Sequence, residues 1–180
     1  MQATWSCLHG VCCMARSDGF SPIARPDARA LILGSLPGRK SITMQQYYAH
    51  PQNAFWPIMR ELFRIEGDYE ERCRQLQRQR IAVWDVLRSS VRRGSLDADI
   101  QLDSAQVNDF EGFFRRHTSV ELIAFNGRKA EQLFRRFVDA GALPPGVGFA
   151  ALPSSSPAYA AMPFSGKLSA WRDALLSGPG

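Results

Sequence analysis

Long apolar runs are missing from this sequence, and so is any arrangement of cysteines typical of a metal centre. No segment approaches the roughly 18 apolar residues that a membrane-spanning helix needs. The N-terminal segment lacks a basic stretch followed by an apolar one, so it does not look like a secretory signal. No Cys-x-x-Cys pair occurs, which argues against a structural zinc or an iron–sulfur cluster. We therefore expect a cytoplasmic protein with no membrane partner, no metal and no other cofactor, and with reduced thiols at Cys7, Cys12, Cys13 and Cys73.

Lysine is scarce as well, and occurs only at Lys40, Lys129 and Lys167. The chain has 22 Lys+Arg against 17 Asp+Glu, a net charge of +5, so nearly all of its positive charge is arginine. A guanidinium suits phosphate recognition, and a moderate positive charge suits an acidic partner such as nucleic acid. A GC-rich genome would produce the same arginine bias, so composition alone does not establish such a partner.

The chain has 180 residues, of which 45 % are hydrophobic and 11 % aromatic. This length suits one domain, and this composition supplies a hydrophobic core rather than a disordered chain. Residues 1–17 show no periodicity, and we expect them to be disordered or a non-native extension. Residues 18–180 then form a single domain.

Four short, almost uninterrupted apolar runs predict buried strands over residues 30–34, 81–87, 120–127 and 147–153. Such runs are typical of parallel strands that helices cover on both faces. The alternation of strands and helices predicts an α/β fold with a mostly parallel sheet, in which ligands bind at the carboxyl ends of the strands. The expected helices cover residues 53–65, 68–80, 104–117, 127–141 and 165–176, the third beginning with a cap at Ser104 and the fourth ending at Gly141.

The loop after the first strand, GSLPGRKS at residues 34–41, has some features of a nucleotide-phosphate loop. A Walker A loop needs Lys and Ser/Thr directly after its second glycine. Here the two glycines are one residue too close, Arg39 intrudes before Lys40, and Pro37 removes a backbone donor. The segment after Ser41 also looks like a loop rather than the helix that a P-loop requires. The loop departs from a P-loop, and an NTPase remains an alternative.

The segment YYAHPQNAFW at residues 47–56 places aromatic and amide side chains behind this basic turn. An aromatic ring stacks on a nucleobase, and an amide reads or polarises the edge of the base. Phe55 and Trp56 fit better as core residues at the start of a helix that Asn53 caps. Tyr48 and Asn53 are the candidates for base binding.

The stretch ILGSLPGRKSITMQQYYAHPQNAFWPIM, with VWDVLRSS, FNGRKA and LPSSSPAYA, resembles the uracil-DNA glycosylase superfamily, in particular its hypoxanthine-DNA (deoxyinosine) glycosylase branch. The resemblance runs from about residue 20 to the C-terminus. It implies a three-layer α/β/α sandwich with a short, mostly parallel four-stranded sheet. It also implies a monofunctional, metal-free enzyme of base excision repair, which hydrolyses the N-glycosidic bond of deaminated bases, chiefly hypoxanthine, in double-stranded or single-stranded DNA. We expect a monomer associated with a bacterial-type nucleoid.

Matching to the family's motifs gives two residues a role at the reaction centre. Because such an enzyme flips its target base out of the duplex, Tyr48 is expected to stack on the flipped base. Asn53 is expected to be catalytic, its carbonyl holding the attacking water and its NH₂ group donating. An amide suffices if the bond breaks toward an oxocarbenium-like sugar while hydrogen bonds stabilise the departing base. Relatives place Asn or Asp inside the first motif, where this chain has Leu36, and this weakens the case for uracil as the principal substrate.

Other candidates for base binding lie after the strands. Ser35 is the only candidate side chain before Pro37 in the first motif. Asp85 either accepts a hydrogen bond from hypoxanthine N1–H, which adenine lacks, or caps the following turn. Asn126 either reads O6 of the base or caps the next helix, and we favour the cap. His50 is expected to bond its own loop, the base or the DNA.

Candidate DNA contacts lie on the first and last loops. Hydroxyl and backbone N–H groups of the second motif are expected to bind phosphates, and its small residues to enter the vacated base stack. This chain has Tyr159 where relatives often have Asn. Arg39, Arg128 and Lys167 either contact phosphate or are simply solvated. The candidates are Lys40, Ser41, Ser154, Ser155, Ser156 and Pro157.

Two other functions stay open. The first is a glycosylase of the same superfamily that prefers uracil or mismatched thymine. The second is a non-catalytic protein that binds damaged DNA, which would bind inosine-containing DNA without releasing a free base.

Overall fold

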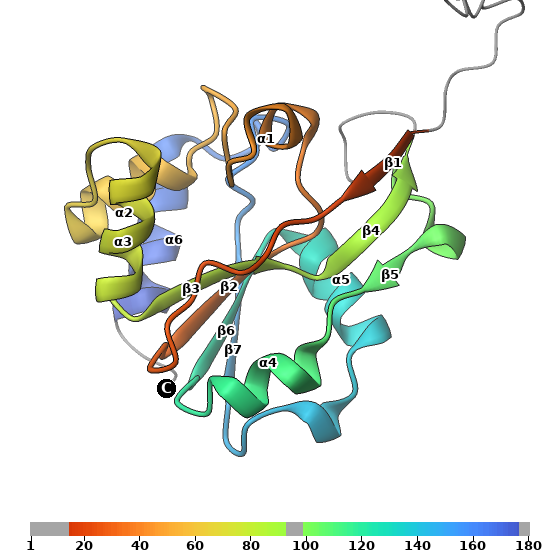
Figure 1. Ribbon diagram of the computed structural model, residues 1–180. Coiled ribbons are helices and arrows are strands. Elements are labelled where there is room, and N and C mark those ends of the chain that lie inside the picture. The colour runs from red at the N-terminus through yellow and green to blue at the C-terminus, as the bar shows by residue number, and fades with distance from the viewer. Residues whose placement is uncertain (1–14, 93–98, 177–180) are drawn as a thin grey trace, which may run out of the picture.

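A parallel sheet lies at the centre of the computed structural model, which describes residues 15–92 and 99–176 (Figure 1). Its strands are β2 (Ala30–Gly34), β3 (Ile81–Asp85), β6 (Leu122–Asn126) and β7 (Gly148–Leu152). They lie in the order β3-β2-β6-β7, and each neighbouring pair is parallel. The four predicted strands and their parallel arrangement are therefore confirmed.

Helices cover both faces of this sheet and give the three layers expected (Figure 1). One face carries α2 (Phe55–Phe63), α3 (Tyr69–Arg78) and α6 (Phe164–Leu176). The other face carries α4 (Phe110–Arg116) and α5 (Arg128–Phe137). Since both faces are covered, every residue of β3 and β6 is buried. None of the helices in the described ranges is both long and apolar enough to cross a membrane.

A short helix and a second sheet were not expected. The helix α1 (Arg39–Met44) begins inside the loop after β2, so part of the segment that looked like a loop is helical. The second sheet is antiparallel and has the order β1-β4-β5. Its strands are β1 (Ala15–Asp18), β4 (Leu87–Arg92) and β5 (Gln106–Val107).

The strand β4 begins two residues after β3 ends, which is why β3 is shorter than the predicted run over 81–87. Residues 15–17, which we had assigned to the N-terminal extension, belong to β1 and pair with β4. The Arg16 guanidinium joins the three strands, because it donates to Ser89 Oγ on β4 and Gln106 Oε1 on β5, each at 2.7 Å. Residues 1–14, with Cys7, Cys12 and Cys13, lie outside the described residues.

Two predicted helix boundaries are wrong. The helix α4 begins after Asp109, whose carboxylate accepts from Gly112 N at 2.8 Å, and not after Ser104. Ser104 instead ends the 3₁₀ turn η2 (Leu102–Ser104), and β5 follows. The helix α5 ends at Phe137 because Val138 takes an extended conformation, so Gly141 lies in a separate 3₁₀ turn, η3 (Ala140–Ala142).

The core between the sheet and α2 is aromatic. Phe55 and Trp171 are fully buried and their rings pack edge to face, with centroids 5.9 Å apart. Trp56 is also buried, so both residues predicted to be core, Phe55 and Trp56, are confirmed as such. This packing fixes the start of α2 against α6, and the segment just before α2 lines the site.

Candidate active site

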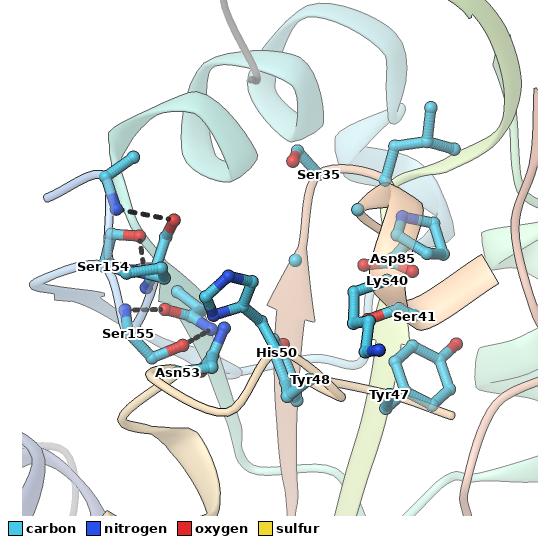
Figure 2. Close-up of a pocket in the computed structure, with 18 of the residues that line it drawn as sticks. Ser35, Lys40, Ser41, Tyr47, Tyr48, His50, Asn53, Asp85, Ser154 and Ser155 are labelled. Atoms are coloured by element: carbon cyan, nitrogen blue, oxygen red, sulfur yellow. Dashed lines mark hydrogen bonds between the residues drawn. The ribbon is translucent and has the colours of Figure 1, made fainter. Parts of the chain in front are cut away.

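A cavity of about 560 Å³ lies at the carboxyl ends of the four parallel strands, where the topology predicts a ligand site. Two segments contribute much of its lining: residues 47–53, here called the aromatic wall, and residues 154–159, here called the serine loop. All of the candidate site residues from the sequence line it (Figure 2): Ser35, Lys40, Ser41, Tyr48, His50, Asn53, Asp85, Asn126, Ser154, Ser155, Ser156 and Pro157. The structure thus brings these residues together around one cavity.

Tyr48 has a left-handed backbone, with φ 55°. This conformation is unfavourable for a residue with a large side chain. Its ring stacks on Phe55, with centroids 4.0 Å apart and planes inclined by 23°. The ring is therefore fixed against the first residue of α2 while it borders the cavity.

Asp85 ends β3 and is only 3 % exposed. A Cβ atom at Gly34, on the neighbouring strand, would collide with the Asp85 carboxylate and lie 3.3 Å from the Tyr48 hydroxyl oxygen. The carboxylate and the hydroxyl therefore approach the same point, and only glycine at position 34 leaves room for both. Burial, and then the Asp85 charge, raise the pKa of Tyr47 well above its ordinary value, so that phenol stays protonated.

Asn53 has its side chain oriented by the start of α2. Its Oδ1 accepts a hydrogen bond from Phe55 N at 3.0 Å, and its backbone N–H donates to His50 O at 2.8 Å. The bond from Phe55 fixes which end of the amide is the oxygen. A carbonyl oxygen has two lone pairs, so Oδ1 retains one acceptor site for another donor.

Asn126 does not cap α5, contrary to the reading that we favoured. The cap residue is Gly127, and α5 has no side-chain cap hydrogen bond. The Asn126 amide instead bonds Ser155 reciprocally: Ser155 N donates to Oδ1 and Nδ2 donates to Ser155 Oγ, both at 2.8 Å. Ser155 is 1 % exposed, and its carbonyl accepts from Ala54 N at 2.9 Å. Ser155 thus joins the end of β6 to the start of α2.

The rest of the serine loop is held by local bonds and by one lysine. Ser154 Oγ accepts from Ser156 N at 3.2 Å, and Ser156 Oγ accepts from Ala158 N at 3.2 Å. Lys167 on α6 donates to Tyr159 O at 2.8 Å and to Ser156 O at 3.4 Å. It is only 5 % exposed, and burial lowers the pKa of its ammonium group. Lys167 is therefore not a solvated side chain, because its ammonium group bonds two carbonyl groups of the serine loop.

The remaining candidates on the first loop and the aromatic wall differ in exposure. Lys40 and His50 are exposed, and His50 Nδ1 accepts from Gln52 N at 3.2 Å. Ser41 is buried and its Oγ accepts from Ala49 N at 3.2 Å, which ties α1 to the aromatic wall. In Figure 2, Ser154, Ser155 and Asn53 lie on one side of the view, and Asp85, Lys40 and Ser41 lie on the other.

The lining also contains residues that were not among the candidates. Leu36, Tyr47 and Tyr159 are the large ones. Tyr47 adjoins Tyr48 in the sequence, but nothing in the pattern distinguished the two rings. Leu36 and Tyr159 depart from the family's motifs in the sequence. This departure is the feature from which their place in the lining could have been predicted.

Comparisons with known proteins agree with this geometry. A family model described as the Uracil DNA glycosylase superfamily matches residues 21–177. A hypoxanthine DNA glycosylase from Methanosarcina acetivorans is 38 % identical over 115 residues, which cover 62 % of this chain and 72 % of the relative. One from Methanosarcina barkeri is 34 % identical over 118 residues, which cover 64 % of this chain and 73 % of the relative.

A solved structure extends the likeness to nearly the whole fold. It is a solution NMR structure from Methanosarcina acetivorans, provisionally described as a uracil DNA glycosylase. Its TM-score is 0.72 at 34 % identity, and the match covers 89 % of this chain and 97 % of that one. By its sequence motifs, its sheet order and these matches, the chain belongs to the uracil DNA glycosylase superfamily.

Proposed function

We propose that the protein is a DNA glycosylase that removes hypoxanthine from DNA by hydrolysing the bond between the base and its deoxyribose. Membership of the superfamily supports the reaction, and the names of the two Methanosarcina relatives support the base. One structural observation carries the proposal: the Tyr48 ring, the Asp85 carboxylate and the Asn53 amide border a single cavity at the carboxyl ends of the strands.

The cavity offers hypoxanthine a stacking surface and an acceptor. A base flipped out of the stack needs an aromatic surface and hydrogen bonds to its edge. Phe55 covers one face of the Tyr48 ring, so the opposite face is the one available to a base. The Asp85 carboxylate, beside the Tyr48 hydroxyl, is an acceptor for N1–H of hypoxanthine. Adenine carries a lone pair at N1 and would be repelled, which gives discrimination between the deaminated base and its parent.

Asn53 is placed to hold the water that attacks the sugar. Its Oδ1 is oriented by Phe55 N and retains a lone pair that accepts a hydrogen bond from water. The bond between C1′ and the base breaks with both electrons passing to the base, and the water oxygen adds to C1′. The water loses a proton and the departing base gains one. Hydrogen bonds to the base as its negative charge develops are worth about 3 kcal/mol each in such sites.

Leu36 supports the assignment of this role to Asn53. It is buried and lines the cavity within the first motif, where relatives in the resemblance carry Asn or Asp. An aliphatic side chain neither orients nor activates water. We therefore assign the water-holding role to Asn53 on the aromatic wall.

DNA is the substrate class that the family implies, and the net charge of +5 suits a polyanion. Lys40 is exposed beside the cavity on α1, where it can contact a phosphate next to the flipped nucleotide. We infer that the protein acts on duplex DNA and on single strands, because the cavity would receive a flipped base from either.

The test is an excision assay on a matched set of substrates. Duplexes and single strands that carry one inosine, uracil, xanthine or adenine are incubated with the protein, and abasic sites are then cleaved with alkali. We expect strand scission with inosine, much less with uracil, and none with adenine. Scission with uracil alone would assign the protein to uracil, and binding to inosine DNA without scission would make it a damage-binding protein.

The Asn53→Ala variant tests the catalytic assignment. We expect excision to fall by roughly 100- to 1,000-fold, since one preorganised polar group at the reaction centre is removed, while DNA binding changes little. Gln52→Ala is the matched control, because it truncates an exposed amide at the adjacent position. Equal excision by Asn53→Ala and Gln52→Ala would remove Asn53 from the mechanism.

A further inference from the structure

We propose, on the basis of the function proposed above, that Tyr69 and Trp56 are positioning residues for base stacking. Their side chains bond the backbone of Tyr47 from two sides and thereby impose the left-handed conformation that directs the Tyr48 ring. Neither residue is needed to touch the base, and the effect of each on excision passes through Tyr48.

The backbone of Tyr48 requires such support because Tyr48 occupies a left-handed position in a turn of residues 47–48, where glycine or asparagine is the usual residue. Four non-glycine residues in the described ranges have a positive φ: Gln45, Tyr48, Arg64 and Arg80. Gln45 and Arg64 are the residues that terminate α1 and α2, and Arg80 closely follows the end of α3. A left-handed residue after a helix is the usual way for a helix to end. Tyr48 ends no helix, so its strained conformation has to be fixed by its surroundings.

The surroundings supply hydrogen bonds on both sides of Tyr48. Trp56 Nε1 donates to Tyr47 O at 3.0 Å, which fixes the peptide plane that precedes Tyr48. Ser41 Oγ accepts from Ala49 N at 3.2 Å, which fixes the plane that follows. Tyr69 Oη accepts from Tyr47 N at 2.9 Å and holds the peptide one step earlier. Since φ and ψ describe the rotation between adjacent peptide planes, these bonds leave Tyr48 little freedom.

The two side chains brace one another. The Trp56 and Tyr69 rings pack edge to face, with centroids 5.9 Å apart and planes inclined by 88°. The Arg72 guanidinium lies over the Trp56 ring, 4.7 Å from its centroid. The indole therefore cannot rotate away from Tyr47 O without losing both ring contacts.

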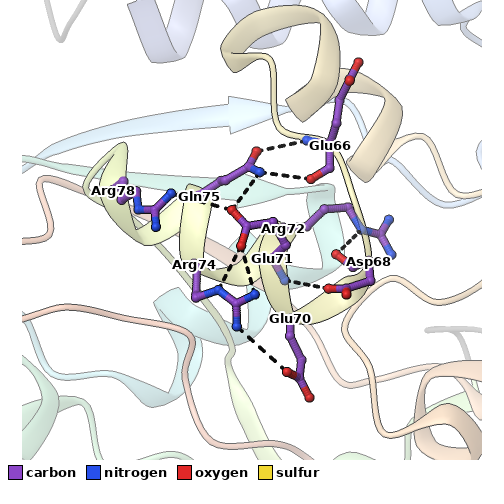
Figure 3. Close-up of polar contacts among 8 residues, drawn as sticks. All are labelled: Glu66, Asp68, Glu70, Glu71, Arg72, Arg74, Gln75 and Arg78. Carbon is purple, nitrogen blue, oxygen red and sulfur yellow. Dashed lines mark hydrogen bonds and ion pairs between the residues drawn. The ribbon is translucent and has the colours of Figure 1, made fainter.

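Tyr69 is itself held by the charged start of α3 (Figure 3). Asp68 accepts from Glu71 N at 2.8 Å and caps the helix whose first residue is Tyr69. Gln75 bonds both backbone groups of Glu66, accepting from its N–H and donating to its carbonyl, each at 3.0 Å. This polar network ties the connection between α2 and α3 to α3, so that Tyr69 faces Tyr47 at a fixed distance.

Tyr69→Phe is the sharpest test, because it removes one oxygen atom and keeps the ring. We expect the kcat/KM for inosine excision to fall about tenfold, through the loss of one partly buried hydrogen bond that orients the stacking ring. Gln77→Met is the matched control. Gln77 also lies on α3, and its Nε2 donates one hydrogen bond to a backbone group, Ala24 O, at 3.0 Å. The control variant should retain wild-type excision, and thermal unfolding should show that both variants are folded.

A double-mutant cycle with Tyr48→Leu separates positioning from general stability. Leucine keeps an ordinary side chain at the left-handed position and lacks the aromatic ring, and we expect it to lower excision by about 10- to 100-fold. If Tyr69 acts through the Tyr48 ring, adding Tyr69→Phe to the Tyr48→Leu variant lowers inosine excision little further. Full additivity of the two losses would overturn the proposal, and so would wild-type excision by Tyr69→Phe.

A crystal structure of Tyr69→Phe gives a readout that does not depend on activity. We expect the φ of Tyr48 to leave the left-handed region, or its ring to leave the stack on Phe55. An unchanged φ and an unchanged stack would overturn the positioning role. If the wild-type protein released no base from any substrate, the proposed function would fail, and this crystal structure would still decide what Tyr69 does.

Discussion

The aromatic wall and the serine loop face the same cavity, but they are fixed in different ways. The aromatic wall contains a strained residue, Tyr48 with φ 55°, and is tied by side chains of α1, α2 and α3. No residue of the serine loop has a positive φ. This loop is tied by Asn126 at the end of β6 and by Lys167 on α6.

This difference separates two tasks. Strain is tolerated where one exact ring orientation is needed, because a relaxed backbone would direct Tyr48 elsewhere. The serine loop needs only a fixed position, which hydrogen bonds to its carbonyl and N–H groups provide. The serine loop is joined to the residue that follows the aromatic wall by one bond, from Ala54 N to Ser155 O at 2.9 Å. We therefore expect changes near the aromatic wall to affect the chemical step, and changes near the serine loop to affect DNA binding.

Apart from the loss of Asn53, the largest effect should come from Gly34→Ala, which tests how the Tyr48 side of the cavity is fixed. The added Cβ would collide with the Asp85 carboxylate and press on the Tyr48 hydroxyl. We expect kcat for inosine excision to fall about 100-fold, since small misplacements of binding groups have effects of this size. Single-turnover excision measures the change.

Gly38→Ala is the matched control on the same loop, because a Cβ there would meet no atom within 4 Å. We expect excision within about twofold of the wild type, as for substitutions that create no clash. Equal losses from the two alanines would show that the loop, and not the contact with Asp85 and Tyr48, limits activity.

A smaller effect is expected from Lys167→Met, which tests the serine loop. The variant keeps the aliphatic stem and loses the hydrogen bonds to Ser156 O and Tyr159 O, so we expect the free energy of unfolding to fall by about 2 kcal/mol. DNA binding should weaken without any change in its salt dependence, because Lys167 is buried and bonds carbonyl groups of the serine loop. Urea unfolding and binding titrations at several salt concentrations measure both quantities.

Lys40→Met is the comparison for that experiment. Lys40 is exposed, and as a phosphate contact its loss should reduce the slope of log K against log salt by about 0.9. A reduced slope in Lys167→Met, with an unchanged slope in Lys40→Met, would reverse the two assignments.

The smallest effect concerns the charged network behind the aromatic wall. Hydrogen bonds from Gln75 and Arg74 lower the pKa of Glu71 from its ordinary value of 4.5. The stability that Glu71 contributes is therefore present above pH 4.5 and is lost as the pH falls through its lowered pKa. We expect Glu71→Gln to lower the urea midpoint slightly at pH 7 and not at a pH well below 4.5.

Glu70→Gln serves as the control, since Glu70 lies 3.8 Å from Arg74 and its side chain is 85 % exposed. Such an exposed pair contributes little. A larger loss from Glu70→Gln than from Glu71→Gln would contradict the network drawn in Figure 3.

Much of the fold could be predicted from the local hydrophobic pattern of the sequence. The apolar runs at β2, β3, β6 and β7 predicted the parallel sheet, and the polar residues after those strands predicted the lining of the cavity. The sheet β1-β4-β5 escaped prediction because its strands lack that pattern: β4 is rich in serine, and β5 has only two residues. The pairing of β1 with β4 joins segments that are far apart in the sequence.

The sequence by itself determined that β2, β3, β6 and β7 form, that these four run in parallel, and which polar residues therefore meet at one edge of their sheet, because each of these depends on local hydrophobic patterning and chain direction. Tertiary structure alone decided that Asn126 binds Ser155, that Lys167 is buried beneath the serine loop, and that Tyr69 and Trp56 hold Tyr47. The physical reason is that a hydrogen bond between distant residues exists only once packing has brought donor and acceptor within about 3 Å of each other. No local pattern encodes which helix will supply the partner.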